Sequence, residues 1–189
     1  MTKKNIKTVC YVSLFAFVIF QFFDLEFLDA IGYSVSLAAA FDVVYDRWLW
    51  RFNPLEDTPR IFGVYDALFI SNYNGRTDHP SVITIKQTLT EISISERAHD
   101  GRSIAVVAKL VKSPVKGDPW NLHYIYETKP DPNDHNDAHQ GTVLLCIRDR
   151  GNMEGSYYTN RIQPTKGKLI LRLRKYPDVP NPIDAHQFN

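Results

Sequence analysis

The sequence predicts an all-β protein: an eight-stranded antiparallel up-and-down β-barrel preceded by an N-terminal hairpin of two transmembrane helices. Three observations support this fold class. The first fifty residues hold two apolar runs, of which the first reaches the length of a membrane helix with its flanks and the second does so only if it includes Asp42. After residue 60, apolar and polar residues alternate in eight short segments, which is the period of β-strands. Turn-rich joints separate the segments, and eight antiparallel strands joined in this way can close into a barrel.

The first apolar run follows a basic start. The string "VCYVSLFAFVIFQFF" has no charge, and with its flanks at residues 6–25 it reaches the roughly 20 residues that a membrane helix needs. A cleaved signal peptide is the alternative. A small-residue cleavage site should then follow the run closely, and here Asp24, Glu26 and Asp29 follow instead. We therefore predict a first span over about residues 6–25.

The second apolar run is "AIGYSVSLAAAF" at residues 30–41. It becomes a full span, over about residues 29–49, only if it includes Asp42. An interfacial or re-entrant helix is the alternative. With this second span, residues 1–50 form a transmembrane hairpin.

Charge at the two ends of the hairpin predicts its orientation. Three lysines precede the first run, Arg47 and Arg51 follow the second, and no Lys or Arg lies between the runs. The positive-inside rule then places the N-terminus and the barrel in the cytoplasm, with a short acidic turn outside. Trp48 and Trp50 lie beside these arginines, a combination typical of the membrane interface.

Four residues of the second run are candidates for assembly in the membrane. Gly32, Ser36 and Ala40 repeat every four residues, and such small side chains let helices approach closely. Packing of the hairpin on itself is the alternative. Asp42 is ionisable and lies near the membrane, where such residues usually face a bundle interior or water. It either marks the end of the span or lines an assembled pore.

The strand candidates begin after a linker. "RFNPLEDTPR" at residues 51–60 has two prolines and mixed charge, which is typical of a domain boundary. The barrel is predicted over residues 61–175 and a tail over 176–189. Strands are expected at about residues 61–71, 81–88, 90–96, 102–112, 121–129, 140–148, 154–161 and 168–175. A small sandwich is the alternative, but closure removes exposed strand edges, and the many Lys and Arg argue against an outer-membrane barrel.

Composition and motifs narrow the function classes. The net charge of +1 gives no global field for DNA or RNA, and we predict neither as a partner. Cys10 lies in an apolar run and Cys146 in a probable strand, so a disulfide is not expected. The sequence has no nucleophile elbow, P-loop or dinucleotide fingerprint, so no catalytic residue is predicted. His135 and His139 lie in or beside a polar, proline-flanked loop that would not fix both imidazoles, so no metal site is predicted either.

The candidate ligand-binding residues combine rings, hydroxyls and positive charge. In "GSYYTNR", Tyr157, Thr159 and Arg161 share one strand face, and a nucleotide needs rings for its bases and guanidinium forks for its phosphates. Ordinary barrel packing is the alternative for the rings, and a solvated outer face is the alternative for the charges. The full candidate set is Tyr157, Thr159, Arg161, Tyr124, Tyr126, Gln87, Lys166 and Arg172.

The whole chain resembles the two-transmembrane, β-strand-rich effectors of bacterial CBASS anti-phage systems, which lie beside a nucleotidyltransferase that makes cyclic oligonucleotides on infection. The order of parts carries the resemblance: a basic start, a helical hairpin, an "NP" linker and then eight strands. Local strings add to it, namely "GVY" at 63–65, "IKQT" at 85–88, "LHYIYE" at 122–127, "HQGT" at 139–142 and "EGSYYTNR" with "TKGKLIL" between 154 and 171.

The resemblance implies a receptor without a catalytic step or cofactor. Its barrel would bind a cyclic dinucleotide from the cognate nucleotidyltransferase. Binding would drive self-association into homo-oligomers, and the multi-pass hairpins would disrupt the bacterial inner membrane and cause abortive infection. Three alternatives remain at this point: a lipocalin-like carrier anchored in the membrane, a protein-binding scaffold, and an unrecognised hydrolase that turns over a nucleotide.

Overall fold

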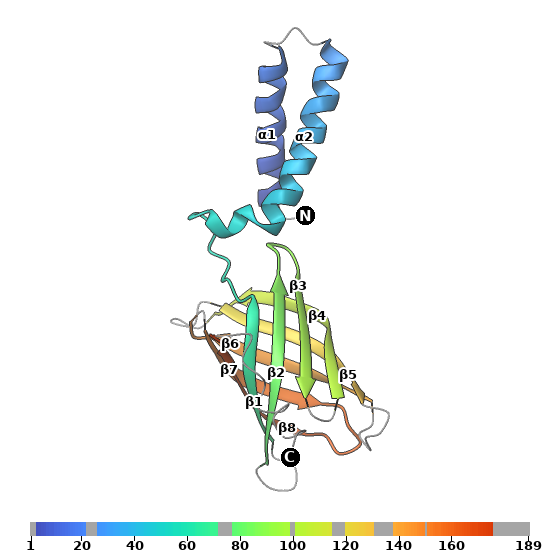
Figure 1. Cartoon of the computed structure of the whole chain (residues 1–189), viewed down its shortest axis with the longest axis vertical. Helices are drawn as coiled ribbons and strands as arrows, with labels where there is room; N and C mark the ends of the chain where they lie inside the picture. The colour runs from blue at the N-terminus through green and yellow to red at the C-terminus, as the bar shows by residue number, and fades with distance from the viewer. Residues whose placement is uncertain are drawn as a thin grey trace. The chain divides into compact units, whose positions relative to one another are not determined.

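The computed structural model describes residues 3–21, 26–71, 77–98, 101–114, 120–130, 138–149 and 151–175 (Figure 1). The chain divides into two compact units. The first contains residues 1–58 with 88–90, and the second contains residues 59–87 with 91–189. The predicted tail over residues 176–189 and the histidine at position 135 lie outside the described residues.

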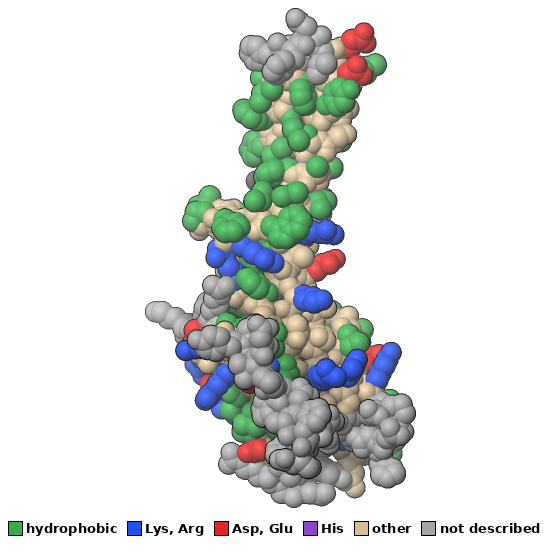
Figure 2. Space-filling model, viewed as in Figure 1, with side chains coloured by type: hydrophobic (Ala, Val, Ile, Leu, Met, Phe, Trp, Pro, Cys, Tyr) green, Lys and Arg blue, Asp and Glu red, His purple; other side chains and the backbone are tan. Residues whose placement is uncertain are grey.

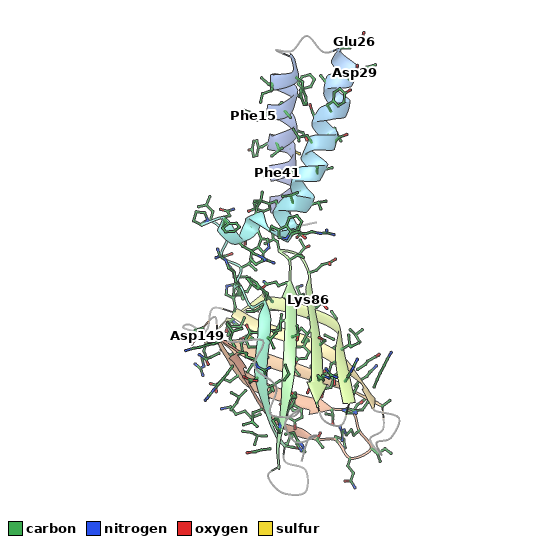
Figure 3. The ribbon with its side chains drawn as sticks, viewed as in Figure 1. Phe15, Glu26, Asp29, Phe41, Lys86 and Asp149 are labelled. Carbon is green, nitrogen blue, oxygen red and sulfur yellow. The ribbon has the colours of Figure 1, made fainter. Side chains whose placement is uncertain are left out.

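The first unit holds the helical hairpin. Helix α1 (Lys3–Gln21) and helix α2 (Phe27–Arg47) lie side by side. Figure 3 shows Glu26 and Asp29 at the turn end of this hairpin. By length and composition, α2 can cross a membrane over Leu28–Arg47, and the apolar part of α1 is the shorter stretch Cys10–Phe20. The apolar N-terminal helix region of the sequence prediction is therefore present.

Small residues form the face of α2 that packs inside the hairpin. Ala30, Ser34 and Ala38 are all buried, and their spacing of four places them on one side of the helix. The Ser34 hydroxyl donates to the Ala30 carbonyl oxygen and so is satisfied within the helix. The predicted stripe of Gly32, Ser36 and Ala40 is exposed and lies on a different face. These three residues therefore do not pack the hairpin on itself.

A short 3-10 helix, η1 (Leu49–Phe52), follows α2 and presents apolar side chains to the outside. We call Trp48, Leu49, Phe52 and Leu55 the apolar ledge; Phe52 is 81% exposed and Leu55 is 82% exposed. Figure 2 shows hydrophobic side chains gathered over the hairpin and this element. Trp50, which was expected at the membrane interface with Trp48, is instead buried, being 1% exposed.

Asn53 fixes the end of this element. Its amide nitrogen donates to the Tyr45 hydroxyl at 2.6 Å, and its side-chain oxygen accepts from the backbone N–H of Leu55 at 2.9 Å. These two bonds hold the turn after η1, so the exposure of Phe52 and Leu55 is imposed by the local structure.

The second unit is a closed barrel of eight antiparallel strands in the order β1 to β8, with β8 paired to β1. This confirms the predicted fold class. The strands are β1 (Gly63–Ser71), β2 (Thr77–Gln87), β3 (Ile92–Ala98), β4 (Gly101–Lys112), β5 (Trp120–Pro130), β6 (His139–Ile147), β7 (Asn152–Thr159) and β8 (Lys166–Leu173). Their bounds differ from the expected ones by a few residues, so β7 ends before Arg161.

Alternation along the strands decides which side chains fill the barrel. Leu169 and Leu171 of β8 are fully buried, whereas Lys168 before them and Arg172 after them are exposed. Strand β4 departs from strict alternation once. A bulge between Ala105 and Val107 inserts an extra residue and shifts which side chains point inward. Beyond the bulge, Ala108 and Leu110 take the inward positions next to the core.

The linker closes one end of the barrel, which we call the linker end. The backbone N–H of Ile61 donates to the Gln87 side-chain oxygen at 2.8 Å, and the Gln87 amide donates to the Pro59 carbonyl at 2.9 Å. The Tyr65 hydroxyl donates to the Ile61 carbonyl at 2.8 Å. Ile61, Tyr65 and Gln87 are all buried. Gln87, a predicted ligand-binding residue, therefore has its amide engaged by the linker.

Candidate functional site

The opposite end of the barrel, which we call the far end, has a polar interior. It is the end at which β3, β5 and β7 finish and β4, β6 and β8 begin. The polar side chains there come from β3 to β7 and from the residue two places after β7. We call this set the far-end cluster: Glu96, Ser103, Tyr124, Tyr126, Thr128, His139, Tyr157, Thr159 and Arg161.

Strand register brings the outermost members of the cluster into one row. Glu96 on β3 pairs with Ser103 on β4, Ser103 pairs with Thr128 on β5, and Thr128 pairs with His139 on β6. The Ser103 and Thr128 hydroxyl oxygens are 2.9 Å apart and share a hydrogen bond. A carboxyl group, two hydroxyls and an imidazole thus follow one another around this end of the barrel.

Three tyrosine rings lie deeper in the barrel than this row. Tyr124, Tyr126 and Tyr157 are each 5% exposed. The ring centroids of Tyr124 and Tyr126 are 6.2 Å apart, and Tyr157 packs edge-on against Phe69 at 5.1 Å. The side chains of the barrel strands are drawn in Figure 3.

Glycine makes room for the Tyr126 ring. Gly141 is the register partner of Tyr126, and the phenol of Tyr126 occupies the place where a Cβ atom of residue 141 would lie. A glycine opposite an aromatic residue in a neighbouring strand lets the ring lie flat against the backbone. The position of Tyr126 therefore depends on the missing side chain at Gly141.

Backbone and side-chain bonds position Arg161. Asn160, just before it, donates its N–H to the Gln140 carbonyl at 2.9 Å, and its side-chain oxygen accepts from the Gln140 N–H at 2.7 Å. Arg161 lies in the loop between β7 and β8. The hydroxyl oxygens of Thr159 and Thr165, at the two ends of this loop, are 2.9 Å apart and share a hydrogen bond. These bonds fix the segment that carries Arg161 against the start of β6.

Arg161 contacts His139, and through His139 it is linked to Tyr126. Its Nη2 lies 3.3 Å from Nε2 of His139. The His139 ring packs edge-on against Tyr126 with centroids 6.3 Å apart. Arg161, His139 and Tyr126 therefore converge on one region at the far end.

Burial and charge keep the two tyrosines of β5 in their neutral form. Burial is the main cause that raises the pKa of Tyr124, and the charges of Glu96 and Tyr126 raise it further. Burial also raises the pKa of Tyr126, with Glu96 and Tyr157 adding to the effect and Arg161 opposing it. Both phenols therefore remain hydrogen-bond donors across the physiological range. Only the Tyr126 phenol is influenced by both a carboxyl group and a guanidinium group.

The structure places five of the eight predicted ligand-binding residues together. These are Tyr124, Tyr126, Tyr157, Thr159 and Arg161, all in the far-end cluster. It separates the other three from them. Gln87 lies at the linker end, bonded to residues 59 and 61.

Lys166 and Arg172 lie on the outer wall of the barrel. Both side chains are exposed, and Arg172 alternates with the buried Leu171 along β8. Lys166 pairs in register with Tyr158, which is also exposed, and Arg172 pairs with Asn152. A site inside the barrel therefore does not include Lys166 or Arg172, and this corrects their grouping with Arg161 in the sequence analysis.

Sequence reasoning missed four members of the cluster. Alternation could have found Glu96, because Ile92 and Ile94 on the same face of β3 are apolar and Ile94 is buried. Nothing in the sequence around Ser103 and Thr128, apart from their hydroxyl groups, pointed to a place in the site. His139 was considered only as a metal ligand. Within the described part of the chain, which omits His135, no group of three or more His, Cys, Asp or Glu residues is placed to hold a metal ion.

The chemistry of the cluster suits a flat, anionic ligand. Aromatic faces stack on bases, and a guanidinium group binds phosphate oxygens in a fork geometry. Hydroxyls and a carboxyl group add directional hydrogen bonds that orient the ligand. A nucleotide offers partners for each of these groups.

Comparison with known proteins agrees with this chemistry. The family model described as "Cap15, cyclic dinucleotide receptor domain" matches residues 56–173, from the linker to the last residue of β8. The CD-NTase-associated protein 15 of Staphylococcus schleiferi is 25% identical over 173 residues, which cover 89% of this chain and 92% of the relative. Because the family match covers more than half of the chain, the chain belongs to the Cap15 cyclic dinucleotide receptor family, the type of CBASS effector that it was found to resemble.

Proposed function

We propose that the far-end cluster binds a cyclic dinucleotide, and that binding drives self-association of the chain in the bacterial inner membrane, which the hairpins then disrupt. One observation carries the binding step. In this barrel, which matches a cyclic dinucleotide receptor family, the guanidinium of Arg161 contacts His139, and the His139 ring packs against Tyr126 next to two further tyrosines.

Each part of a cyclic dinucleotide has a partner of suitable chemistry in this cluster. The Arg161 guanidinium binds a phosphate, and the rings of Tyr124, Tyr126 and Tyr157 stack on the bases. Stacking on an aromatic side chain contributes about 1–3 kcal/mol per base. The relative from Staphylococcus schleiferi is named for its association with a CD-NTase, and we propose that a cognate nucleotidyltransferase supplies the ligand here.

The hairpin anchors the receptor in the membrane. Helix α2 has the length and composition of a membrane span, and the apolar ledge exposes large side chains directly after it. Trp48 and the neighbouring Arg47 and Arg51 suit the interface between lipid and water. We propose that the ledge lies in the cytoplasmic interface, with the N-terminus and the barrel on the cytoplasmic side.

Self-association has two candidate surfaces. The stripe of Gly32, Ser36 and Ala40 is exposed, and it lies apart from the face of α2 that packs in the hairpin. Small residues in such a stripe allow a second helix to approach closely. Asp42 follows the stripe on α2 and is half-buried, so an assembled bundle could enclose it.

The outer wall of the barrel offers the second surface. Val107, Ile125 and Tyr158 are exposed, and the first two are register partners on β4 and β5. Thr142 of β6 connects this pair to Tyr158 in register. A protein-binding scaffold would use the same wall, whereas a lipocalin-like carrier is less well supported because the far end of the interior is polar.

The energetics of ligand-driven assembly are within reach of such a ligand. Shifting a two-state equilibrium from 1:99 to 99:1 needs a differential affinity of about 10⁴, or roughly 5.5 kcal/mol. Two stacked bases and one charge-assisted phosphate contact can supply a contribution of this order. Confinement in a membrane raises the effective concentration and favours assembly further.

Vesicle leakage tests this proposal. The full-length chain is reconstituted into dye-loaded vesicles and treated with cyclic dinucleotides, with the corresponding linear dinucleotides as controls. We expect dye release only with a cyclic ligand, and none for Arg161→Ala. Release that is independent of ligand would contradict ligand control, and saturable binding without release would contradict membrane disruption while leaving the receptor step intact.

A further inference from the structure

We infer that Asp46 couples the barrel strands to the membrane hairpin, as a positioning residue outside the far-end cluster. It holds the turn between β2 and β3 on the end of α2, so that a displacement of these strands on ligand binding reaches the helix. This inference rests on the proposed function, because it assumes that a ligand in the barrel controls the hairpin. It adds the residue through which that control passes.

Hydrogen bonds hold residues 88–90 on the last turn of α2. The backbone N–H of Leu89 donates to the Asp46 carbonyl oxygen at 3.0 Å. The carboxylate oxygen Oδ1 of Asp46 accepts from the Thr90 N–H at 3.0 Å and from the Thr90 hydroxyl at 2.8 Å. We call these three bonds the Asp46 clamp. In agreement with them, residues 88–90 belong to the first compact unit, whereas the strands on either side, β2 and β3, belong to the second.

An acidic residue is unfavourable at this place in a helix. Helix α2 ends at Arg47, so Asp46 lies in its last turn, where the carbonyl groups carry partial negative charge and cations are favoured. Arg47 follows this preference and Asp46 does not. Thr90 compensates the carboxylate with two donors, and hydrogen bonds to an ionised group are among the stronger ones. A residue that breaks a local rule in this way is expected where it has a function beyond the helix itself.

The linker after α2 leads back to the same turn. Pro59 and Ile61 of the linker bond to the side chain of Gln87, the last residue of β2, and Gln87 directly precedes the clamped turn. Helix α2, the linker, the end of β2 and the Asp46 clamp therefore form one closed ring of chain and hydrogen bonds. Domains joined by a single linker move relative to each other by default. A displacement of β2 or β3 must here move the end of α2 or break the clamp.

Strand β3 connects the clamp to the proposed ligand site. It begins at Ile92, two residues after Thr90, and within its seven residues it carries Glu96 of the far-end cluster. Coupling between distant sites requires a physical connection whose arrangement both sites influence. One short strand, hydrogen-bonded to β2 and β4 on its two sides, provides this connection from the cluster to the clamp.

Paired dye-release and calorimetric titrations of the full-length chain test the inference. The probe is whichever of cyclic di-GMP, cyclic di-AMP and cyclic GMP–AMP the wild type binds. Asp46→Ala removes the two side-chain bonds of the clamp and an unfavourable charge from the end of α2, so the helix should stay folded. We expect the ratio of the ligand concentration at half-maximal release to the dissociation constant to rise about tenfold or more, as for lost hydrogen bonds to a charged group.

Thr90→Val tests the clamp from its other side. Valine keeps the branched shape and removes the hydroxyl bond to Asp46, so the ratio should rise in the same direction but by less. Added to Asp46→Ala, it should have no further effect, because both changes remove the same bond. Thr84→Val is the matched control: Thr84 is half-buried on β2, outside the turn, and its replacement should leave the ratio unchanged. Circular dichroism verifies that each variant is folded.

The outcomes separate this inference from the proposed function. An unchanged ratio in Asp46→Ala, dye release by that variant without ligand, or an equal rise in Thr84→Val would contradict the inference, while the wild type still binds and releases dye. A folded wild-type chain that binds none of the three probes would contradict the proposed function, and this inference with it. Binding by the wild type without release would contradict membrane disruption, the step on which the inference depends.

Discussion

Arg161 and His139 are 22 residues apart in the chain, and their Nη2 and Nε2 atoms lie 3.3 Å apart at the far end of the barrel. The contact exists because Asn160 bonds twice to Gln140, which places the segment after β7 against the first residues of β6. A loop arginine, which would otherwise sample many positions in water, is held beside a histidine ring that itself packs against Tyr126. Fixing the guanidinium before the ligand arrives reduces the entropy lost on binding.

Replacing this arginine should weaken binding without unfolding the barrel. Hydrogen bonds to charged groups contribute about 1.5–3 kcal/mol, so Arg161→Ala should lower the affinity for the cyclic dinucleotide by about ten- to hundredfold. Arg172→Ala removes the same kind of charge from the outer wall and should leave the affinity unchanged. Isothermal titration of both variants measures the difference. Equal losses in the two variants would show that the arginines act only through long-range charge.

Gly141→Ala should displace the Tyr126 ring. The added Cβ atom would meet the phenol of Tyr126, and overpacking of this kind costs about 1–3 kcal/mol. We expect a lower unfolding temperature and weaker ligand binding. In Gly151→Ala the new atom would lie 3.5 Å from Asp149 Oδ1 and 3.7 Å from Leu173 Cβ, which are ordinary contacts. A glycine-to-alanine change with no effect at position 141 would mean that Tyr126 can move freely.

The stability of the barrel should fall at alkaline pH because of its buried tyrosines. Burial and Glu96 raise the pKa of Tyr126 above the value of 10.0 for an unperturbed tyrosine. Its contribution to stability is therefore complete below about pH 10 and is lost as the pH rises through the higher value of the folded state.

Tyr126→Phe should reduce this dependence. The unfolding temperature of the wild type should fall more between about pH 8 and about pH 11 than that of the variant. Thermal unfolding at both pH values provides the measurement. Identical slopes for the two proteins would contradict the link between burial of the Tyr126 phenol and alkaline instability.

The two small-residue faces of α2 should respond differently to a larger side chain. Ala38 is buried in the hairpin, so Ala38→Leu should overpack it and lower helix stability. An added Cβ atom at Gly32 has no neighbour within 4 Å, so Gly32→Leu should leave the hairpin intact and weaken self-association. Circular dichroism in detergent and cross-linking with ligand separate the two effects. Unimpaired assembly of Gly32→Leu would remove the stripe from the proposed interface.

Much of the architecture follows from local sequence patterns. The alternation in "KLILRLR" places Leu169 and Leu171 inside the barrel, and the structure agrees. The same alternation places Arg172 outside, so its grouping with Arg161 contradicted a signal that the sequence already contained. The outcome shows that charge near a predicted site is weaker evidence than the face on which the charge lies.

Other features depend on the pairing of distant segments and could not be derived from local patterns. In "LHYIYE", apolar and polar groups occur on both faces, so only closure of the barrel decides that Tyr124 and Tyr126 point inward. The row from Glu96 to His139 exists only through the register of β3, β4, β5 and β6. The bulge beside Ala105 also reverses the faces of β4 halfway along the strand.

The engagement of Gln87 is a further case of this kind. Alternation placed its side chain with Ile83 and Ile85, and all three are buried. Nothing in the sequence indicated that the amide would bond to Pro59 and Ile61 of the linker. Gln87 was predicted to bind ligand, but its partners in the structure come from a segment 26 to 28 residues earlier in the chain.

The central claim is that this barrel is a receptor for a cyclic dinucleotide. The most direct test is a calorimetric titration of the full-length chain in detergent with cyclic di-GMP, cyclic di-AMP and cyclic GMP–AMP, each compared with its linear counterpart. The account predicts saturable binding of at least one cyclic ligand, no binding of its linear form, and about ten- to hundredfold weaker binding in Arg161→Ala. A folded chain that binds none of the three cyclic ligands would contradict the account.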